Sequence, residues 1–348
     1  MKKLIIVGGI CVGGGAPVTV QSMANTRTSD IRETAAQINR LAKAGCDIVR
    51  VAVPDIASAD AIGEIKKLIA IPLVADIHFD YKLAVRAAEA GADKIRINPG
   101  NIGGTENVRA VADICRKKGI PIRVGVNGGS VGKEHLARYN GLTPEAMYDS
   151  ALENIQLLNK FGFDDICVSV KTSSVPLTIA AYKLLHSRSD YPLHLGVTEA
   201  GTENQGLIKS AIGIGSLLVE GIGDTIRVSL TAPPEREVEA ALTILSVLGL
   251  RKKYELISCP TCGRCKIDLI PIALEVERRL AVFGVDITVA VMGCPVNGPG
   301  EASRADYGIA GSDGAGVIFK KGKIYKNVKM DMLIDELFIA IESGEKST

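Results

Sequence analysis

The stretch PLVADIHFDYKLAVRAAEAGADKIRIN, residues 72–98, contains one complete strand–helix–strand unit. Its β-branched apolar runs at 72–77 and 94–98 predict buried strands, and the alanine-rich segment 81–91 between them predicts a helix. The helix ends in Ala-Gly before Ala-Asp, as a C-cap glycine does when the chain turns into the next strand. This unit therefore predicts two parallel strands joined by a helical crossover.

The same unit recurs along the first 250 residues. Further strand candidates lie at 17–23, 47–53, 121–127, 165–171, 193–198 and 225–230, and helical patterns at 30–45, 143–162 and 235–249. Eight such units in roughly 230 residues predict an α/β fold of the (β/α)8 TIM-barrel type. A doubly wound open sheet is the alternative, but no Gly-x-Gly-x-x-Gly follows the first strand, which favours the barrel.

The pattern changes after RKKYE, residues 251–255. There follow a short strand (254–258), a cysteine-rich turn, a helix (266–284), a strand (286–292), a cysteine loop, strand-like segments (316–323 and 325–328) and a last helix (329–344). This order indicates a small α+β domain. We therefore predict a barrel domain over 1–252 and an α+β domain over 253–348.

Composition and charge exclude several classes of function. The chain has 348 residues, a net charge of +2, no Trp and 4% aromatic residues, which argues against binding to nucleic acid or to membrane surfaces. No apolar run approaches the ~20 residues of a membrane helix, and the apolar start is too short and glycine-rich for a signal peptide. Eight cysteines are too few for a disulfide framework in a chain this long, so we expect a cytoplasmic protein with reduced thiols.

Basic and polar side chains lie late in the predicted strands, where a closed barrel has its active-site mouth. Residues two apart in a strand share a face, so the Arg and Asn or Ser residues of one strand point the same way. The set comprises Arg50, Arg96, Asn98, Arg123, Asn127, Lys171, Arg227 and Ser229, with Asp76 and His78 at the end of the third strand and Thr198 and Glu199 at the end of the seventh.

The cations in this set outnumber the carboxylates that obviously face them, Asp76 and Glu199. Clustered buried cations are costly unless an anion joins them, and the Arg fork suits phosphate. Glycine-rich loops at 98–104, 127–130 and 198–204 offer backbone N–H groups. We predict an anionic ligand, most simply a phosphate or diphosphate; a structural ion-pair network is the alternative for any single Arg. His78 is a candidate proton donor.

Cysteines near the C-terminus indicate a soft-metal site. Cys259 and Cys262 form a C-x-x-C pair in SCPTCGRC, and Cys294 lies in the Gly/Pro-rich loop VMGCPVNGPGE. With Cys265 the spacing is close to that of a bacterial ferredoxin. A zinc site remains an alternative, although a zinc ribbon needs a second Cys pair or a paired His, and no His follows residue 194. The spacing favours an iron–sulfur cluster over zinc or a metal-free site.

ISCPTCGR together with VMGCPVNGPGE resembles the 4-hydroxy-3-methylbut-2-enyl diphosphate synthase family, bacterial enzymes of the methylerythritol phosphate route to isoprenoids. The opening segment VGGICVGGGAPVTVQSMANT is similar to that of the family. Further similar segments are ADIHFD, KIRINPGNIG, RVGVNGGS, SVKTS, GVTEAG and IRVSLT. The resemblance extends over nearly the whole chain.

The resemblance implies a TIM-type barrel joined to a 4Fe-4S domain, in a homodimer where the cluster domain of one subunit caps the barrel mouth of the other. It implies Cys259, Cys262 and Cys294 as thiolate ligands and Glu301 as an oxygen ligand, which leaves Cys265 a bystander; a four-cysteine cluster is the alternative. An oxygen ligand that exchanges more easily than thiolate would open one iron to a substrate oxygen.

The implied activity is an iron–sulfur oxidoreductase that opens the ring of 2-C-methyl-D-erythritol 2,4-cyclodiphosphate, with two electrons from ferredoxin or flavodoxin passing through the cluster. The implied substrate contacts are Arg50, Arg96, Asn98, Arg123, Asn127, Lys171, Thr198, Arg227 and Ser229, with Glu199, Glu301, Asp76 and His78 as catalytic residues. The alternatives are a redox-silent barrel with structural zinc acting on a phosphorylated or pterin-like substrate, and a non-enzymatic zinc-bearing interaction module.

Overall fold

The computed structural model describes residues 2–252, 254–283, 286–294, 302–312 and 314–345. Contacts divide the chain into two compact units, Met1–Arg251 and Lys252–Thr348. No described helix has the length and apolar character that crossing a membrane requires.

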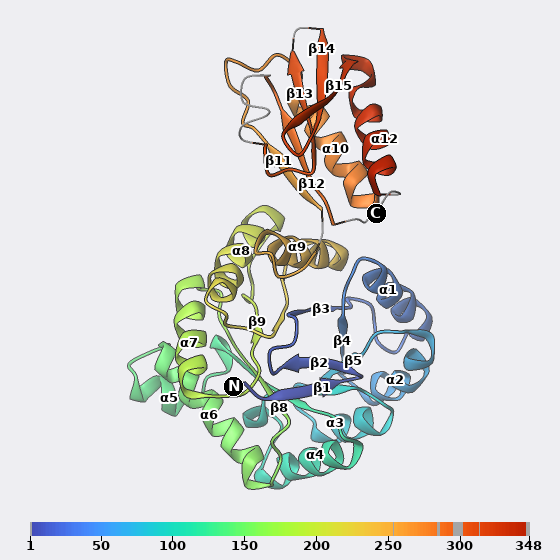
Figure 1. Ribbon diagram of the computed structural model, residues 1–348. Coiled ribbons are helices and arrows are strands. Elements are labelled where there is room, and N and C mark those ends of the chain that lie inside the picture. Colours follow the sequence, from blue (N-terminus) through green and yellow to red (C-terminus); the bar gives the residue numbers. More distant parts are fainter. Residues whose placement is uncertain (1, 253, 284–285, 295–301, 313, 346–348) are drawn as a thin grey trace. The chain divides into compact units, whose positions relative to one another are not determined.

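The first unit is a nearly closed parallel barrel, which confirms the predicted fold (Figure 1). Its strands are β3 (Thr19–Met23), β4 (Ile48–Ala52), β5 (Leu73–Asp76), β6 (Lys94–Ile97), β7 (Ile122–Asn127), β8 (Ile166–Lys171), β9 (His194–Leu195) and β10 (Thr225–Ile226). They lie in the order β8-β7-β6-β5-β4-β3-β10-β9. A parallel bridge between Val168 and Leu193 joins the two ends of this sheet.

Helices surround the barrel (Figure 1). They are α1 (Ile31–Lys43), α2 (Ile56–Leu68), α3 (Tyr81–Glu89), α4 (Thr105–Lys118), α6 (Pro144–Lys160), α7 (Val175–Arg188), α8 (Glu203–Val219) and α9 (Pro234–Val247), with the short α5 (Lys133–Arg138) before α6. The side chains of Asp30, Asp55 and Asp80 accept hydrogen bonds from first-turn N–H groups of α1, α2 and α3. These N-caps fix where each helix starts after its strand.

The seventh and eighth strands are shorter than the predicted 193–198 and 225–230. A Cβ on Gly196 would lie 2.6 Å from Lys171 Nζ and 2.7 Å from Arg227 O, so the chain runs unusually close to its neighbours at this point. Backbone hydrogen bonds continue beyond the regular ladder, from Arg227 N to Leu195 O (3.0 Å) and from Thr198 N to Thr172 O (3.2 Å). Both segments therefore remain part of the barrel wall.

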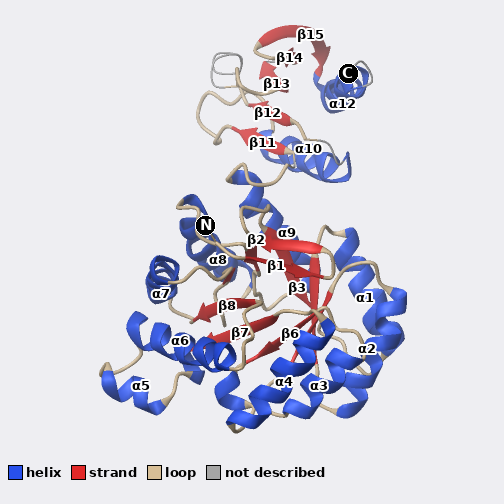
Figure 2. Ribbon diagram, turned by 60° about the horizontal axis from the view of Figure 1, so that its bottom comes forward, coloured by secondary structure: helices blue, strands red, loops and turns tan. Residues whose placement is uncertain are grey.

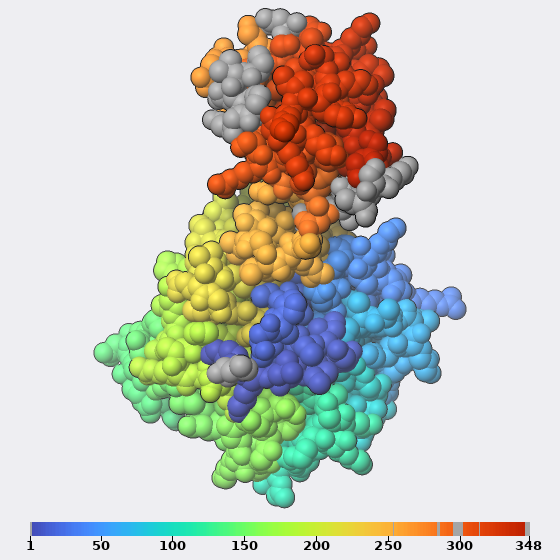
Figure 3. Space-filling view, viewed as in Figure 1, coloured from blue at the N-terminus to red at the C-terminus, as the bar shows by residue number. Residues whose placement is uncertain are grey.

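An antiparallel hairpin that the sequence did not predict precedes the barrel. It consists of β1 (Leu4–Val7) and β2 (Ile10–Gly13), and its buried residues Ile5, Val7 and Val12 pack on Ile48, Val74 and Cys167. Those three residues lie near the N-terminal ends of their strands, so the hairpin closes the end of the barrel opposite the strand C-termini. Figure 3 shows it in dark blue across the middle of this face of the barrel unit.

Lys94 lies inside the barrel below the strand ends. It is fully buried, and its Nζ has no hydrogen-bond partner among the described residues. Burial lowers its pKa to about 8; nearby Cys167 opposes this shift, and Arg123 and Arg50 add to it. A protonated Lys94 therefore destabilises the fold.

The second unit is a small α+β domain, as predicted. Its strands are β11 (Glu255–Ser258), β12 (Thr288–Met292), β13 (Tyr307–Ser312), β14 (Ala315–Lys320) and β15 (Lys323–Lys329), adjacent in this order (Figure 2). β11, β12 and β13 are parallel, and β14 and β15 complete an antiparallel meander. Helices α10 (Leu269–Phe283) and α12 (Leu333–Glu345) share one hydrophobic core with this sheet.

Glycines explain the differences from prediction in this unit. β13 was not predicted, because its two glycines look like turn residues. A Cβ on Gly308 would lie 2.2 Å from the Phe319 ring, and one on Gly311 would lie 2.1 Å from the Ile267 side chain. The predicted strand 316–323 is divided at Lys321 and Gly322, whose φ angles of 48° and 73° form a two-residue hairpin turn.

We predict that Ile5→Ala lowers the free energy of unfolding by about 2–5 kcal/mol, because it empties apolar volume between the hairpin and the barrel. Ile6→Ala is the matched control: the same side chain one residue on is 57% exposed, so its effect should stay within about 0.5 kcal/mol. Denaturant unfolding compares them, and equal effects would show that the hairpin does not seal the barrel.

The pKa of Lys94 predicts how stability depends on pH. Between its folded value of about 8 and its ordinary value of 10.5, the unfolded chain holds a proton that the native state lacks, so stability rises with pH. The full gain is on the order of 3 kcal/mol. Lys94→Met should lack this rise when unfolding is compared at pH 7.5 and pH 10.5. Parallel curves for the two proteins would contradict the assignment.

Candidate active site

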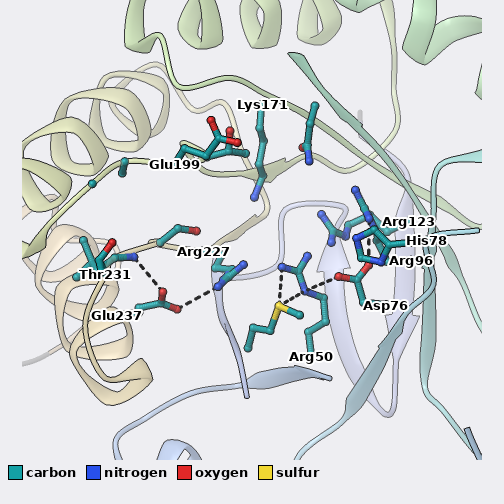
Figure 4. A pocket seen from close by; sticks show the side chains of 17 residues that line it. Arg50, Asp76, His78, Arg96, Arg123, Lys171, Glu199, Arg227, Thr231 and Glu237 are labelled. Carbon is teal, nitrogen blue, oxygen red and sulfur yellow. Dashed lines mark hydrogen bonds and ion pairs between the residues drawn. The ribbon is translucent and has the colours of Figure 1, made fainter. Parts of the chain in front are cut away.

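A cavity of about 400 Å³ lies at the C-terminal ends of the barrel strands (Figure 4). Most of the residues predicted from strand alternation line it together: Arg50, Asp76, His78, Arg96, Arg123, Asn127, Lys171, Thr198, Glu199, Arg227 and Ser229. The direction of the strands and the alternation of their side chains therefore predicted which residues come together at this cavity. The roles of these residues remain predictions.

Asn98 does not line this cavity. β6 ends at Ile97, and the Asn98 side chain accepts a hydrogen bond from Gly100 N (3.2 Å) in the turn that follows. Asn98 instead lines a separate cavity with Ser130 and Asn154. Asn98 therefore lies outside the arginine-lined cavity, and its substrate contact remains a prediction.

Asp76 holds two of the cavity's guanidinium groups. Arg96 Nη1 donates to its Oδ1 (3.1 Å), and Arg50 Nε lies 3.6 Å from its Oδ2. Burial alone would raise the pKa of Asp76, but Arg50, Arg96 and Arg123 outweigh burial and lower this pKa to about 2. Asp76 is therefore ionised across the physiological range and orients cations in the ligand-free protein.

Arg123 and Lys171 are buried, and no carboxylate of the described residues lies within 4.0 Å of either cation. Arg123 is 2% exposed; its Nη1 donates to Ser169 Oγ (3.0 Å), and its Nε and Nη2 have no partner among the described residues. Burial and then Arg96 lower the pKa of Arg123 to about 10. Burial, with Arg123 next, lowers the pKa of Lys171 well below its usual value. These donors point to a ligand that supplies negative charge.

Arg227 is held by a carboxylate that sequence reasoning missed. Glu237, 5% exposed, lies 3.4 Å from Arg227 Nη2 through its Oε2, which also accepts from Ser22 Oγ (3.4 Å). Its Oε1 accepts from Leu230 N (3.0 Å) in the loop after β10. Glu237 lies on helix α9 rather than at a strand end, so strand parity could not find it. Its acidic position in the first turn of the eighth helix was the available signal.

The charges that line the cavity do not balance. Its cations are Arg50, Arg96, Arg123, Lys171 and Arg227, and its carboxylates are Asp76, Glu199 and Glu237. With His78 neutral, the lining carries a formal excess of two positive charges. A ligand with about two negative charges would neutralise it.

Glu199 and His78, both labelled in Figure 4, are exposed side chains that line the cavity. Glu199 has a φ of 52°, a left-handed conformation that costs a non-glycine residue roughly 1 kcal/mol. Such strain is typical of functional positions. His78 is exposed and lies against Phe79, with ring centroids 6.0 Å apart. Neither side chain is fixed by a described hydrogen bond, so both are free to meet a ligand.

The cysteines of the second unit lie at neighbouring strand ends. β11 and β12 pair in parallel, and Cys259 and Cys294 follow them. Gly293 N donates to Cys259 Sγ (3.2 Å), and a Cβ on Gly293 would lie 2.5 Å from Cys265 Sγ. Cys262 is exposed, and hydrogen bonds from Arg264, the backbone N–H foremost, lower the pKa of its thiol.

This arrangement brings Gly293, the residue before Cys294, against the thiols of Cys259 and Cys265. The described residues contain no set of three His, Cys, Asp or Glu side chains already arranged to hold a metal ion. Glu301, predicted as both a cluster ligand and a catalytic residue, lies outside the described residues. The soft thiol donors suit an iron–sulfur cluster or zinc.

Comparison with known proteins identifies two family domains. Residues 2–242 match the GcpE TIM-barrel domain, and residues 255–343 match the GcpE protein C-terminal domain. The 4-hydroxy-3-methylbut-2-en-1-yl diphosphate synthase (flavodoxin) of Caldanaerobacter subterraneus subsp. tengcongensis is 61% identical over 99% of this chain and 99% of its own. The protein of the same name from Caldicellulosiruptor saccharolyticus is 57% identical over 100% of this chain and 100% of its own. That from Geobacter sulfurreducens is 55% identical over 98% of this chain and 97% of its own.

Solved structures of other enzymes share the barrel. Dihydropteroate synthase from Stenotrophomonas maltophilia superposes with a TM-score of 0.53 at 13% identity, covering 71% of this chain and 97% of its own. The Yersinia pestis dihydropteroate synthase gives 0.51 at 14% identity, covering 72% and 100%. At such identities the likeness shows the fold alone. The two domain matches and the identities of 55% to 61% over nearly the full length show that this chain belongs to the GcpE family.

Proposed function

We propose that this protein reductively converts 2-C-methyl-D-erythritol 2,4-cyclodiphosphate to (E)-4-hydroxy-3-methylbut-2-enyl diphosphate. The observation that carries the proposal is the buried cavity with two uncompensated positive charges, in a chain 61% identical to a synthase of that name. A cyclic diphosphate has one ionised oxygen on each phosphate, so its two negative charges match this excess.

The cavity residues would bind and orient the diphosphate. Arg50 and Arg96 are held by Asp76, and Arg227 is held by Glu237, so these guanidinium groups meet the ligand already positioned. Arg123 and Lys171, which have no carboxylate partner among the residues that the structure describes, would bind the ionised oxygens directly. Asn127, Thr198 and Ser229 would add neutral hydrogen bonds. Binding would relieve the mutual repulsion of these cations.

The reaction consumes two electrons and two protons, written for the fully protonated species. The ring C–O bond to one phosphate breaks, the diphosphate stays on the product, and a hydroxyl group leaves as water. Arg123 and Lys171 would stabilise charge on the departing phosphate oxygen. Asp76, with a pKa of about 2, is unsuited to donate a proton near neutral pH, so His78 and Glu199 are the proposed proton carriers.

The proposed cofactor is a 4Fe-4S cluster held by Cys259, Cys262 and Cys294, with Glu301 as the fourth ligand and Cys265 as the alternative. When bound, such a cluster supplies single electrons from a protein donor. The relatives' names specify flavodoxin, and we propose flavodoxin or ferredoxin here. A homodimer and a cytoplasmic location complete the proposal; both rest on family resemblance and composition.

The decisive experiment uses protein purified and reconstituted without oxygen. We expect about four iron and four sulfide per chain, and consumption of the cyclodiphosphate with dithionite as reductant. One zinc per chain would favour the redox-silent barrel or the interaction module. A fully loaded cluster without turnover would reject the proposed reaction.

Single cysteine variants identify the ligands. We expect Cys294→Ser to lose the cluster's visible absorbance and all turnover, because a hydroxyl is a poor substitute for a thiolate bridge to iron. Cys265→Ser is the matched control and should keep both if Glu301 is the fourth ligand. Loss of the cluster in Cys265→Ser would instead indicate four-cysteine ligation.

Arg123→Met tests the anion site in the absence of turnover. We expect the Kd for inorganic diphosphate to rise about 10-fold to 100-fold, since charge-assisted hydrogen bonds are lost. The thermal midpoint without ligand should not fall, because the variant removes a buried cation with unmet donors. Calorimetric titration and thermal unfolding measure both quantities. An unchanged Kd would place the anion elsewhere.

A further inference from the structure

The β14–β15 hairpin of the second unit concentrates positive charge. Five lysines fall within residues 320–329, and no Asp or Glu occurs between residues 314 and 330. Residues 252–348 carry thirteen Lys and Arg against thirteen Asp and Glu. The unit is thus neutral overall by sequence, and its positive charge is gathered on one hairpin.

β15 is an edge strand that is open to solvent on both faces. All its residues but Val328 are exposed, including Ile324 (66%) and Tyr325 (57%). Lys326 pairs with Glu336 (2.6 Å). Lys323 and Lys329 have no carboxylate within 4.0 Å among the described residues. This strand therefore offers unpaired positive charge beside apolar side chains.

Protection of the edge explains only part of this pattern. Lysines on an edge strand discourage pairing with other chains. Preventing such pairing does not require Lys321 in the turn, and the exposed apolar side chains of Ile324 and Tyr325 would instead favour association with other chains. Exposed aromatic and aliphatic side chains ringed by charge are typical of a protein-binding surface.

The register places this strand near the cysteine loop. Met292, two residues before Cys294, is in register with Ala310, which pairs with Val317, which pairs with Asn327. Three strand spacings amount to about 14 Å. Lys329, two residues beyond Asn327, pairs with Ala315 at the end of the sheet where Cys294 follows β12. Lys323 pairs with Lys320 at the opposite end of the sheet, level with Tyr307 and Val289.

We propose that β15 and the turn before it form the docking surface for an acidic electron-carrier protein of the flavodoxin kind. The proposal rests on the proposed function, which requires electrons from such a carrier. Negative side chains around the carrier's redox group would meet Lys329, at the Cys294 end of the strand, and acidic side chains farther from that group would meet Lys321 and Lys323 at the other end. Ile324 and Tyr325, between these lysines, would supply the apolar centre. Electron-transfer complexes are small and transient, and opposite charges raise their association rate.

The test reverses three of these charges. Lys321→Glu, Lys323→Glu and Lys329→Glu are combined in one variant. The matched control combines Lys117→Glu and Lys118→Glu, in the last turn of α4, with Lys160→Glu, in the last turn of α6; these lysines are exposed like those of the hairpin. Each is assayed with a reduced flavodoxin of negative net charge, and separately with dithionite. Calorimetry measures the flavodoxin Kd directly at low and high salt.

We expect the hairpin variant to lose at least about 10-fold in flavodoxin-dependent kcat/KM at low salt, and to bind flavodoxin correspondingly more weakly. Its rate with dithionite and its thermal midpoint should match those of the unmodified protein and the control. Added salt should weaken flavodoxin binding to the unmodified protein but hardly affect the variant.

Equal losses in both variants, or none in the hairpin variant, would overturn the docking surface. Aggregation of the hairpin variant with undiminished flavodoxin binding would likewise overturn it and leave edge protection as the role of the lysines. No turnover of unmodified protein with dithionite would refute the proposed function instead, and the binding measurement would still decide the docking surface.

Discussion

The barrel mouth buries more positive charge than its own carboxylates neutralise, and much of the first unit is arranged around that imbalance. Asp76 and Glu237 do not cancel the field. Asp76 fixes the guanidinium groups of Arg50 and Arg96 and Glu237 fixes that of Arg227, whereas Arg123 and Lys171 have no carboxylate within 4.0 Å in the described part of the chain. Isolated buried cations oppose folding. The rigid strands that hold them supply the compensating stability through a continuous apolar layer between sheet and helices.

That arrangement separates stability from function along the barrel axis. At one end the β1–β2 hairpin packs apolar side chains on the strand starts. At the other end, N–H groups of Arg96, Arg123 and Arg227 have no hydrogen-bond partner within the described part of the chain. Donors that have no partner in the free protein increase its affinity for a diphosphate. The bound diphosphate relieves the repulsion among the cations and also forms new hydrogen bonds. The backbone of Glu199, held in a left-handed conformation, fits the same pattern of energy stored where a ligand binds.

Strand alternation predicted most of this cavity from the sequence, because a period of two assigns each side chain to a face without any tertiary information. This rule does not reach residues outside the strands. Asn98 follows the last strand residue and accepts a hydrogen bond from Gly100 N, so its substrate contact stays a prediction, and Glu237 reaches the cavity from a helix. β13 was not predicted, because its two glycines are typical of a turn. In the structure they instead allow close packing against Phe319 and Ile267. The cysteine pattern indicated a soft-metal site, but spacing alone cannot rank Cys265 against an oxygen ligand.

The closed end of the barrel also determines how the protein can be handled. Lys2 donates hydrogen bonds to the backbone carbonyls of His186 and Ser189, and Lys3 N donates to Asp190 O (2.7 Å), so the chain enters beside the strand starts. An affinity tag or fluorophore attached ahead of Lys2 would emerge on the side away from the cavity. Immobilisation through that end would leave the mouth accessible to small molecules, which suits surface-based screening for diphosphate mimics.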